Sequence, residues 1–336
     1  MIADSPRVAF IVNPVAGGGK ANRSWSRLKK HIPCWISFEV HFSQAPGHAV
    51  NLSADIATEN YDAVVAVGGD GTISEVVNGL LSVGMASERY IGPALGVIPA
   101  GRGNDLARTF SLSSEPLDAW RRQQSQLGQV QRYLDVGRVL NSSQEQLSYF
   151  VNMCGVGLDA DVAEIANSLP RILGGFIPYL IGVVVSFMGM KYHKTTVRLS
   201  GVEEVPEMEP DAWGTIENSG DSEGQQTHII EDALLLTTIG VGRFIGGGMM
   251  LLPHSVQGDG SLDVMLVRAK GRLFLLSLLT KSFKGEHLKH PDVAYFRARS
   301  VDVSGPDNVN VHADGDPITY GGAAFDVLPA ILPVLF

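Results

Sequence analysis

The stretch AVVAVGGDGT, from Ala63 to Thr72, decides the fold of this chain. It begins with an apolar run rich in valine, as in a buried strand, and glycines follow at once. Two similar stretches flank it: Val8–Val12 runs into NPVAG at 13–17, and Leu95–Ile98 runs into PAGRGND at 99–105. A strand, a glycine-rich turn and a segment of helical spacing, repeated in this order, predict a parallel α/β domain. Its turns should gather at the carboxyl edge of the sheet, where such domains bind ligands.

The central turn, Gly68-Gly69-Asp70-Gly71-Thr72, carries the sharpest chemical signal. Glycines let a backbone approach phosphate oxygens closely, and the N–H groups that open the next helix attract the anion. A carboxylate beside phosphates is repulsive unless a cation lies between them. Asp70 therefore predicts a Mg²⁺ ion shared with a bound nucleotide, directly or through water. The alternative is a plain tight turn at the end of a strand.

The first glycine turn excludes two common nucleotide-binding motifs. Lys20 is followed by Ala21, so the Walker A pattern is absent, and Asn22 stands where a Gly-x-Gly-x-x-Gly fingerprint needs its last glycine. A standard P-loop NTPase and a dinucleotide dehydrogenase are therefore disfavoured.

From about Tyr133 the pattern changes to short alternating runs, which predict a mainly β domain. We expect an α/β nucleotide-binding domain at 1–132 and a β domain at 133–336, with the last residues packing back on the first domain. The expected strands of the second domain are Leu134–Leu140, Tyr149–Met153, Thr195–Leu199, Ala233–Ile239, Ser261–Val267, Arg299–Val303 and Ala323–Leu328.

An acidic segment at 201–227 interrupts the β domain with eight Asp or Glu and no Lys or Arg. Its charge, prolines and glycines predict a loop insertion, either a solvated hairpin or a regulatory arm. The whole chain has 26 Lys or Arg against 35 Asp or Glu, for a net charge of −9. This balance argues against nucleic acid as a partner, because binding to phosphate backbones needs excess positive charge.

Two apolar segments with basic neighbours suggest contact with an anionic membrane surface. The first is Ile172–Met190, which has no charged residue, but its glycines and proline favour a buried or interfacial helix over a membrane span. The second is Arg268–Arg299, with eight Lys or Arg against two acidic residues around the apolar run Leu273–Leu279. A core helix with solvated ends is the alternative for this second segment.

Cysteine usage and the start of the chain predict a cytoplasmic location. The chain has two cysteines, too few for a disulfide framework, and they show no metal-ligand spacing. The first residues carry an Asp and lack the basic flank and apolar core of a signal peptide.

Together the three turns resemble the diacylglycerol kinase catalytic-domain superfamily, which includes bacterial diacylglycerol kinases and the sphingosine and ceramide kinases. The resemblance extends along nearly the whole chain. Its matching residues are Asn13, Pro14, Gly17, Gly68 to Thr72, Glu75, Asn78, Gly101, Asn104 and Asp105, then Asn152, Gly155, Gly157, Asp159, Gly246 to Gly248, Pro253, Asp259 to Asp263, and Asp314-Gly315-Asp316.

The resemblance implies an α/β domain like that of NAD kinases and phosphofructokinases, followed by a lipid-binding β-sandwich, with the active site in the cleft between them. It implies ATP as co-substrate with Mg²⁺, and a structural Mg²⁺ held by the Asp259 side chain and by backbone oxygens near Val256 and Ser261. The general base would be Asp316, and Asp70 would also be catalytic. The implied nucleotide-binding residues are Asn13, Pro14, Val15, Ala16, Gly17, Ser43, Gly68, Gly69, Asp70, Gly71, Thr72, Glu75, Gly101, Arg102, Asn104 and Asp105.

The sequence departs from the family pattern at several of these positions. Asp316 replaces the usual Glu as base and is shorter by one methylene group, which puts the rate in doubt more than the role. Arg102 replaces a common Thr, and we interpret it as an additional phosphate clamp because a guanidinium binds phosphate oxygens bidentately. Ser43 replaces a Thr but keeps the hydroxyl.

The leading hypothesis is an ATP-dependent lipid kinase that converts diacylglycerol to phosphatidic acid as a cytoplasmic enzyme bound peripherally to the membrane. A sphingoid or ceramide-type lipid is an alternative acceptor, and homodimerisation is left open. The second hypothesis is an NAD kinase-like enzyme, which shares the Gly-Gly-Asp-Gly-Thr turn. The third is a non-catalytic nucleotide-binding or lipid-binding pseudokinase, suggested by the change at Asp316.

Overall fold

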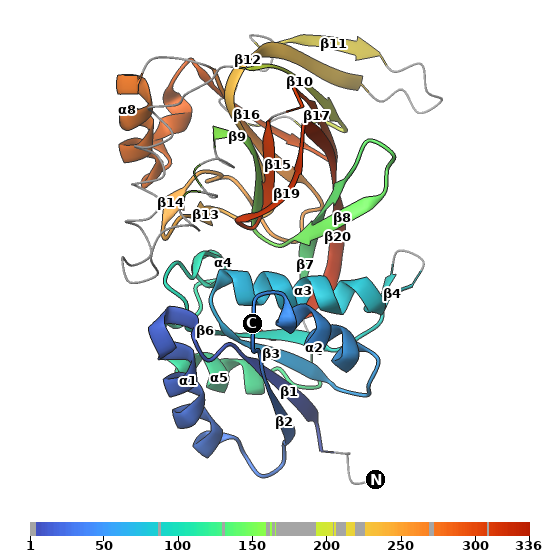
Figure 1. The fold of residues 1–336 in the computed structure, drawn as a ribbon, viewed down its shortest axis with the longest axis vertical. Helices are drawn as coiled ribbons and strands as arrows, with labels where there is room; N and C mark the ends of the chain where they lie inside the picture. The colour runs from blue at the N-terminus through green and yellow to red at the C-terminus, as the bar shows by residue number, and fades with distance from the viewer. Residues whose placement is uncertain are drawn as a thin grey trace. The chain divides into compact units, whose positions relative to one another are not determined.

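The computed structural model describes residues 5–86, 89–129, 132–158, 162, 165, 193–203, 205, 213–218, 226–268, 272–307 and 309–336. They form two compact units (Figure 1). Unit 1 runs to Leu134 and includes Ala330–Phe336, and unit 2 is Asp135–Pro329. The apolar segment predicted at Ile172–Met190, the family residue Asp159 and much of the acidic insertion at 201–227 lie outside the described residues.

Unit 1 is built on a parallel sheet in the order β2-β1-β3-β6-β20. Valine, isoleucine and alanine fill its central strands β1, β3 and β6, because helices cover both faces and leave no polar side. The strands that lie wholly within unit 1 are β1 (Arg7–Val12), β2 (Ser37–Phe42), β3 (Ala63–Gly68), β4 (Met85–Ala86), β5 (Arg89–Tyr90) and β6 (Ala94–Pro99).

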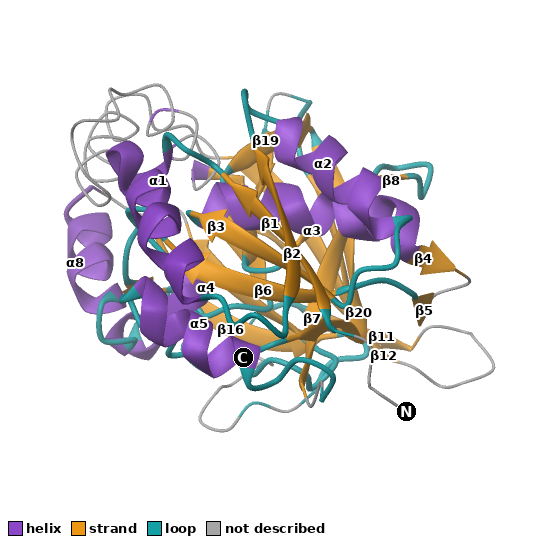
Figure 2. Cartoon of the chain, turned by 90° about the horizontal axis from the view of Figure 1, so that it is seen from below, coloured by secondary structure: helices purple, strands orange, loops and turns teal. Residues whose placement is uncertain are grey.

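Helices α1 and α5 cover one face of this sheet, and α2 and α3 cover the other (Figure 2). Trp25 of α1 and Trp120 of α5 pack against Phe10 of β1, with ring centroids 4.9 and 5.2 Å from the Phe10 centroid. The helices of unit 1 are α1 (Ala16–Leu28), the 3₁₀ helix η1 (Lys29–His31), α2 (His48–Ala57), α3 (Asp70–Gly84), α4 (Asp105–Thr109) and α5 (Pro116–Gln124).

The end of the chain belongs to the sheet of unit 1. Strand β20 (Gly322–Val334) begins in unit 2, and its last residue, Val334, pairs in parallel with Leu95 of β6. The N–H of Leu335 donates to the Leu95 carbonyl at 3.0 Å, and the ring of Phe336 lies 4.8 Å from that of Phe110. Both terminal side chains are buried.

Unit 2 is mainly antiparallel β structure around a hydrophobic core. Its strands, apart from β20, are β7 (Arg132–Leu140), β8 (Gln146–Phe150), β9 (Met153–Gly157), β10 (His193–Ser200), β11 (Thr215–Asn218), β12 (Gln226–Gly240), β13 (Phe244–Ile245), β14 (Met249–Met250), β15 (Leu262–Arg268), β16 (Val293–Ala298), β17 (Ser300–Ser304), β18 (Asn310–Ala313) and β19 (Asp316–Tyr320). Helix α8 (Arg272–Ser282) and the 3₁₀ helix η4 (Glu286–Lys289) pack beside a second apolar cluster of the same unit.

The structure has strands at all seven places predicted for the second half of the chain, but two details differ. The strand predicted at Tyr149–Met153 is broken into β8 and β9, because Asp314 accepts the N–H groups of Val151 and Asn152, both at 3.0 Å. The sequence does not predict strands β11, β13, β14, β16, β18 and β19.

The described part of the acidic insertion is not an open loop. Residues Thr215–Asn218 form β11, which pairs antiparallel with the start of β12. Trp213 is buried, and its carbonyl oxygen is hydrogen-bonded to the Nε2 of His228. Strand pairing satisfies the backbone hydrogen-bonding groups of this segment. None of the helices in the described ranges combines the length and the apolar character that crossing a bilayer requires.

Candidate active site

The three glycine-rich turns follow β1, β3 and β6, which are adjacent and parallel, so the turns meet at one edge of the sheet as predicted. A hydrogen bond links the first two turns directly: Asn13 Nδ2 donates to the hydroxyl of Thr72 at 3.0 Å. The N–H of Asn13 also donates to the carbonyl of Val67 at 3.1 Å. Asn13 thus holds the first turn against the second.

Glycine is required where these turns touch. Gly17 has φ +59°, and a Cβ there would lie 2.2 Å from the carbonyl oxygen of Ala100 in the third turn. A Cβ at Gly68 would lie 2.4 Å from the hydroxyl oxygen of Thr72. A side chain at Gly17 would push the first turn away from the third, and one at Gly68 would displace Thr72 within the second turn, because real Cβ contacts are longer than this.

Asp70 begins helix α3 and ties the second turn to the third. Its Oδ1 accepts the N–H of Leu106 at 3.1 Å. Burial raises the pKa of Asp70, while hydrogen bonds from the backbone N–H groups of Leu106, Asp105 and Asn104 lower it. The carboxylate therefore receives the N–H groups that open helix α4, a place where negative charge is stabilised.

The third turn is closed by its own side chain. Asn104 has a left-handed backbone with φ 52°, and its Oδ1 accepts the N–H of Gly101 at 2.8 Å. Its Nδ2 donates back to the carbonyl of Gly101 at 3.2 Å. The side chain of Arg102 is exposed beside this closed turn.

Glu75 lies on α3, but its carboxylate is occupied by the start of another helix. Oε1 accepts the N–H of Gly47 at 3.0 Å, and Oε2 accepts the N–H of Ala49 at 3.1 Å. Glu75 therefore positions the loop between β2 and α2. That loop includes Ser43, a buried residue whose N–H donates to the carbonyl of Val12 at 2.9 Å.

The carboxylates of Asp70 and Asp105 flank Gly103. A Cβ at Gly103 would lie 3.0 Å from Asp70 Oδ2 and 3.1 Å from Asp105 Oδ2. Asp105 also forms an ion pair with Arg108. Two carboxylates side by side at this edge of the sheet are hard oxygen donors, the kind of ligand that Mg²⁺ prefers.

The two aspartates of the terminal Asp-Gly-Asp motif, which lies in unit 2, differ in their surroundings. Asp314 has φ 49° and accepts the N–H groups of Val151, Asn152 and Met153 at 3.0 to 3.1 Å, so it is a structural residue. Asp316 opens β19, and its side chain is exposed. Asp316, the predicted base, is therefore accessible to solvent, and Asp314 holds the start of the hairpin in place.

The resemblance implies a metal ion at Asp259, but the residues present do not fit one. Asp259 Oδ1 accepts the N–H of Ser261 at 3.1 Å, and Oδ2 is paired with the guanidinium of Arg297. Ser261 is buried, and Val256 is half exposed. Across the described residues, no group of three or more His, Cys, Asp or Glu is arranged to hold a metal ion.

The structure does not bring Asp259 and Asp316 onto neighbouring strands. Asp259 precedes β15, which pairs with β12, whereas Asp316 begins β19. Strands β12, β9 and β18 lie between β15 and β19 in the sheet. The turn that contains Asp259 is therefore separate from the hairpin of the predicted base.

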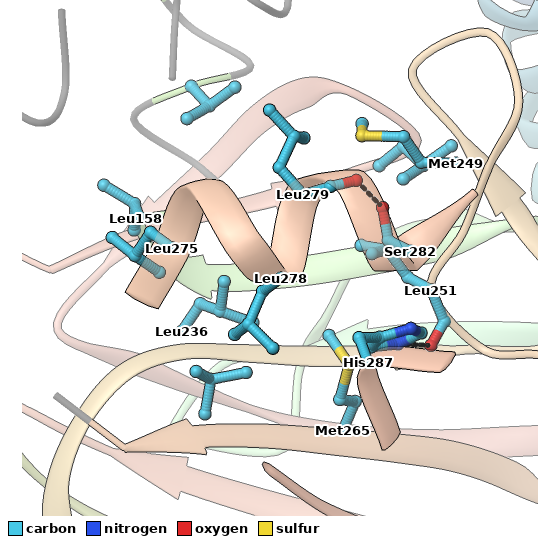
Figure 3. Close-up of a pocket in the computed structure, with 13 residues that line it drawn as sticks. Leu158, Leu236, Met249, Leu251, Met265, Leu275, Leu278, Leu279, Ser282 and His287 are labelled. Atoms are coloured by element: carbon cyan, nitrogen blue, oxygen red, sulfur yellow. Dashed lines mark hydrogen bonds between the residues drawn. The ribbon is translucent and has the colours of Figure 1, made fainter. Parts of the chain in front are cut away.

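Unit 2 also contains an apolar pocket that the sequence did not reveal (Figure 3). Helix α8 forms one wall, and strands β12 and β15 form another. Its polar residues, Ser282 and His287, are both buried. The apolar side chains labelled in Figure 3 are Leu158, Leu236, Met249, Leu251, Met265, Leu275, Leu278 and Leu279.

The two polar residues of the pocket bond to backbone. Ser282 Oγ donates to the Leu279 carbonyl at 2.7 Å. His287 Nε2 lies 3.1 Å from the Leu251 carbonyl, so Nε2 carries the proton, because a carbonyl oxygen only accepts. Burial lowers the pKa of His287 to about 4, and the ring is neutral near pH 7. The pocket is therefore uncharged.

Sequence reasoning missed several buried polar residues that shape the two units. Asp135 Oδ2 accepts the N–H groups of Gly258 and Gly260 at 2.8 and 3.0 Å. Gln123 bonds both backbone groups of Val97 in β6, at 2.6 and 2.7 Å. In the sequence, Asp135 is a charged residue within a predicted strand, and this exception to the apolar pattern could have indicated a buried polar role.

Comparisons with known proteins match both halves of the chain. Residues 7–139 match the diacylglycerol kinase catalytic domain, and residues 152–336 match the YegS C-terminal NAD kinase beta sandwich-like domain. The diacylglycerol kinase of Bacillus subtilis (strain 168) is 26% identical over 94% of this chain and 90% of its own length. The diacylglycerol kinase of Mycobacterium tuberculosis (strain ATCC 25618 / H37Rv) is 27% identical over 98% of this chain and 94% of its own length.

Solved structures share the fold. A crystal structure of a diacylglycerol kinase from Bacillus anthracis str. Sterne superposes with a TM-score of 0.65 at 17% identity, over 100% of this chain and 98% of that one. The two domain matches together cover most of the sequence, in the order that the two units have here. The chain therefore belongs to the diacylglycerol kinase catalytic-domain family, with its α/β domain followed by a β-sandwich-like domain.

Proposed function

We propose that this chain is an ATP-dependent lipid kinase that transfers the γ-phosphoryl group to a lipid hydroxyl, most directly that of diacylglycerol to give phosphatidic acid. The observation that carries the proposal is the uncharged apolar pocket of unit 2. Apolar walls favour a hydrocarbon chain, since burial contributes about 0.8 kcal/mol per CH₂ group. The relatives from Bacillus subtilis and Mycobacterium tuberculosis are both named diacylglycerol kinase.

ATP would bind at the three turns of unit 1. The glycines of the second turn expose backbone N–H groups to the phosphates, and the exposed Arg102 is available as a clamp. Mg²⁺ bound with the nucleotide would neutralise phosphate charge, and Asp70 and Asp105 are the residues that would face it. Asp70 also holds the N–H of Leu106, so it orients the third turn while it faces the nucleotide.

Asp316 would act as the general base. Its carboxylate takes the proton from the lipid hydroxyl while the hydroxyl oxygen bonds to the γ-phosphorus. The bond from that phosphorus to the bridging oxygen breaks, and ADP leaves. The exposed position of Asp316 at the start of β19 is compatible with this step.

We also propose a peripheral contact between helix α8 and an anionic membrane. Leu276 and Phe283 are 42% and 40% exposed, and the lysines at 281, 284 and 289 are exposed on the same segment. The structure reduces the charge available there: Arg268 is paired with Asp232 at 2.6 Å, and Arg297 is paired with Asp259. Among the described residues on α8 and the segment that follows it, Lys281, Lys284 and Lys289 carry the proposed contact.

Transfer of labelled γ-phosphate from Mg-ATP tests the kinase proposal. The acceptors are diacylglycerol, monoacylglycerol, phosphatidylglycerol, ceramide and sphingosine in mixed micelles, with NAD as a soluble control. Labelled diacylglycerol is expected. Label on ceramide or sphingosine would keep the lipid kinase and change the acceptor, and label on NAD alone would replace the proposal with an NAD kinase.

Vesicle co-sedimentation tests the membrane contact. Binding should require phosphatidylglycerol in the vesicles and weaken as salt increases. A variant with Lys281, Lys284 and Lys289 changed to Gln should bind less, whereas changing the exposed Lys29 and Lys30 of unit 1 should have no effect. Equal binding by both variants would contradict the assignment to α8.

A further inference from the structure

Three carboxylates lie close together at the turn before β15. Asp259 lies in the turn itself, Asp263 follows in β15, and Glu203 comes from the segment after β10. The side chain of Asp263 is 1% exposed. Three neighbouring carboxylates need a cation beside them, because like charges repel one another and the buried carboxylate of Asp263 is costly to bring out of water.

The guanidinium of Arg297 faces all three carboxylates. Its Nη2 pairs with Asp259, its Nη1 lies 3.5 Å from Glu203 Oε2, and its Nε lies 3.6 Å from Asp263 Oδ1. Each nitrogen therefore faces a different acidic side chain. The planar guanidinium presents its donors in a fixed fork, which suits this three-way arrangement.

The backbone holds Arg297 in this position from two sides. In the register of β15 with β16, Arg297 stands opposite Asp263. On its other side it forms an isolated bridge with Glu203, whose N–H donates to the Arg297 carbonyl at 2.9 Å. The placement of the guanidinium therefore follows from strand pairing and does not depend on a flexible side chain alone.

Neighbouring side chains complete the network. Ser261 Oγ donates to Glu203 Oε1 at 2.8 Å, and Tyr295 donates its hydroxyl to Asp263 Oδ1 at 2.7 Å. A guanidinium keeps its positive charge throughout the ordinary pH range, so Arg297 supplies the cation that these carboxylates require.

We propose that Arg297 is the resident cation of this turn, in the place where the family resemblance implies a divalent metal. The carboxylates of Asp259, Asp263 and Glu203 surround a guanidinium supplied by β16. Unit 2 of this chain then keeps Asp259 and the start of β15 in place without a divalent ion. This inference does not rest on the kinase activity proposed above.

Thermal unfolding without nucleotide tests the proposal. The wild-type Tm should be the same in excess EDTA and in millimolar MgCl₂ or MnCl₂. Arg297→Gln removes the cation and should lower the Tm by several degrees in EDTA, because it leaves a carboxylate cluster uncompensated. Magnesium should raise the Tm of this variant, since the oxygens of Asp259 are now open to a metal.

Arg299→Gln is the matched control. Arg299 lies two residues away with an exposed side chain, so its replacement changes the net charge equally and leaves the cluster intact. Its Tm should equal that of the wild type with and without metal. If Arg297→Gln does not fold in EDTA, recovery of folded protein on refolding in Mg²⁺ gives the same answer.

Two results would overturn the proposal. One is a wild-type Tm that rises with Mg²⁺ and loses this response in Asp259→Asn, which would place a metal at the turn. The other is an Arg297→Gln protein as stable in EDTA as Arg299→Gln. The Asp259→Asn variant also distinguishes metal binding at this turn from metal binding at Asp70, because the substitution affects only binding at the turn.

Discussion

Gly101 and Gly69 pack backbone against backbone where the second and third turns of unit 1 meet. A Cβ at Gly101 would lie 2.4 Å from the Cα of Gly69, and a Cβ at Gly69 would lie 2.9 Å from the Cα of Gly101. Neither contact is with the end of a flexible side chain. The second and third turns therefore adopt their mutual position only because neither residue has a side chain.

Gly101→Ala is expected to destabilise unit 1 by about 1–3 kcal/mol, as overpacking typically does, and to weaken ATP binding. Gly71→Ala is the control, because a Cβ there has no heavy atom within 4 Å. Thermal unfolding should show a lower Tm for the first variant and an unchanged or higher Tm for the second. Equal Tm values would show that the turns separate without cost.

Asp70→Asn should retain the fold and lose phosphoryl transfer by roughly a hundredfold or more, since it removes a charge that faces the nucleotide. Asparagine keeps an oxygen for the N–H of Leu106, and burial already raises the pKa of the Asp70 carboxyl. Circular dichroism and the lipid kinase assay check the two parts. A fully active Asp70→Asn enzyme would restrict this residue to holding the third turn.

Asp316→Ala and Asp314→Ala should fail in different ways. Loss of a general base costs about 10²–10⁴ in rate, so Asp316→Ala should be inactive with an unchanged Tm. Asp314→Ala leaves the N–H groups of Val151, Asn152 and Met153 without their acceptor and should lower the Tm. Asp316→Glu restores the longer side chain and should be active. Wild-type turnover by Asp316→Ala would remove it as the base.

The buried His287 should make the protein less stable in acid. Its pKa is about 4 in the folded chain against an ordinary value of 6.5, so between these values the unfolded chain binds the extra proton. Stability should therefore fall as pH falls from 6.5 to 4, by up to about 3 kcal/mol. His287→Gln keeps a donor for the Leu251 carbonyl and does not titrate.

The Tm of the wild type and of His287→Gln, measured across this pH range, checks that prediction. The difference in Tm between the two proteins should be smaller at low pH than at pH 7, because only the wild type loses stability through this side chain as the pH falls. Parallel curves would mean that the ring of His287 takes up its proton without opening the pocket.

Leu278→Phe should reduce transfer to long-chain diacylglycerol more than to a short-chain analogue, because Leu278 lines the apolar pocket. Leu276→Phe is the matched control: it lies on the same helix, is 42% exposed and does not line the pocket. Values of kcat/KM for the two lipids give the comparison. The same chain-length profile for both variants would exclude the pocket as the acyl site.

Much of the architecture follows from local sequence alone. The runs at Val8–Val12 and Ala63–Val67 are apolar throughout and end in glycines, so they predict strands buried on both faces and turns that bind phosphate. Parallel pairing then brings Asn13 and Thr72 to the same edge of the sheet, as expected. Short-range periodicity carries this information, because each element is built from residues adjacent in the chain.

The roles of single polar residues were decided by the tertiary structure. Glu75 matches a nucleotide-binding motif in sequence, yet both of its oxygens accept N–H groups near the start of α2. Asp314 and Asp316 are two residues apart, and only the fold shows that the first holds the break between β8 and β9. Which donor reaches a carboxylate depends on strands far away in sequence, and no local pattern encodes that.

The sequence by itself determined the α/β and β character of the two halves, the edge at which the glycine turns meet and the family. Only the tertiary structure revealed the apolar pocket beside α8 and the pairing of Arg297 with Asp259, 38 residues apart in the chain. The physical reason is common to both. A pocket and an ion cluster form between elements that fold back on one another, and their chemistry exists only after distant strands have paired.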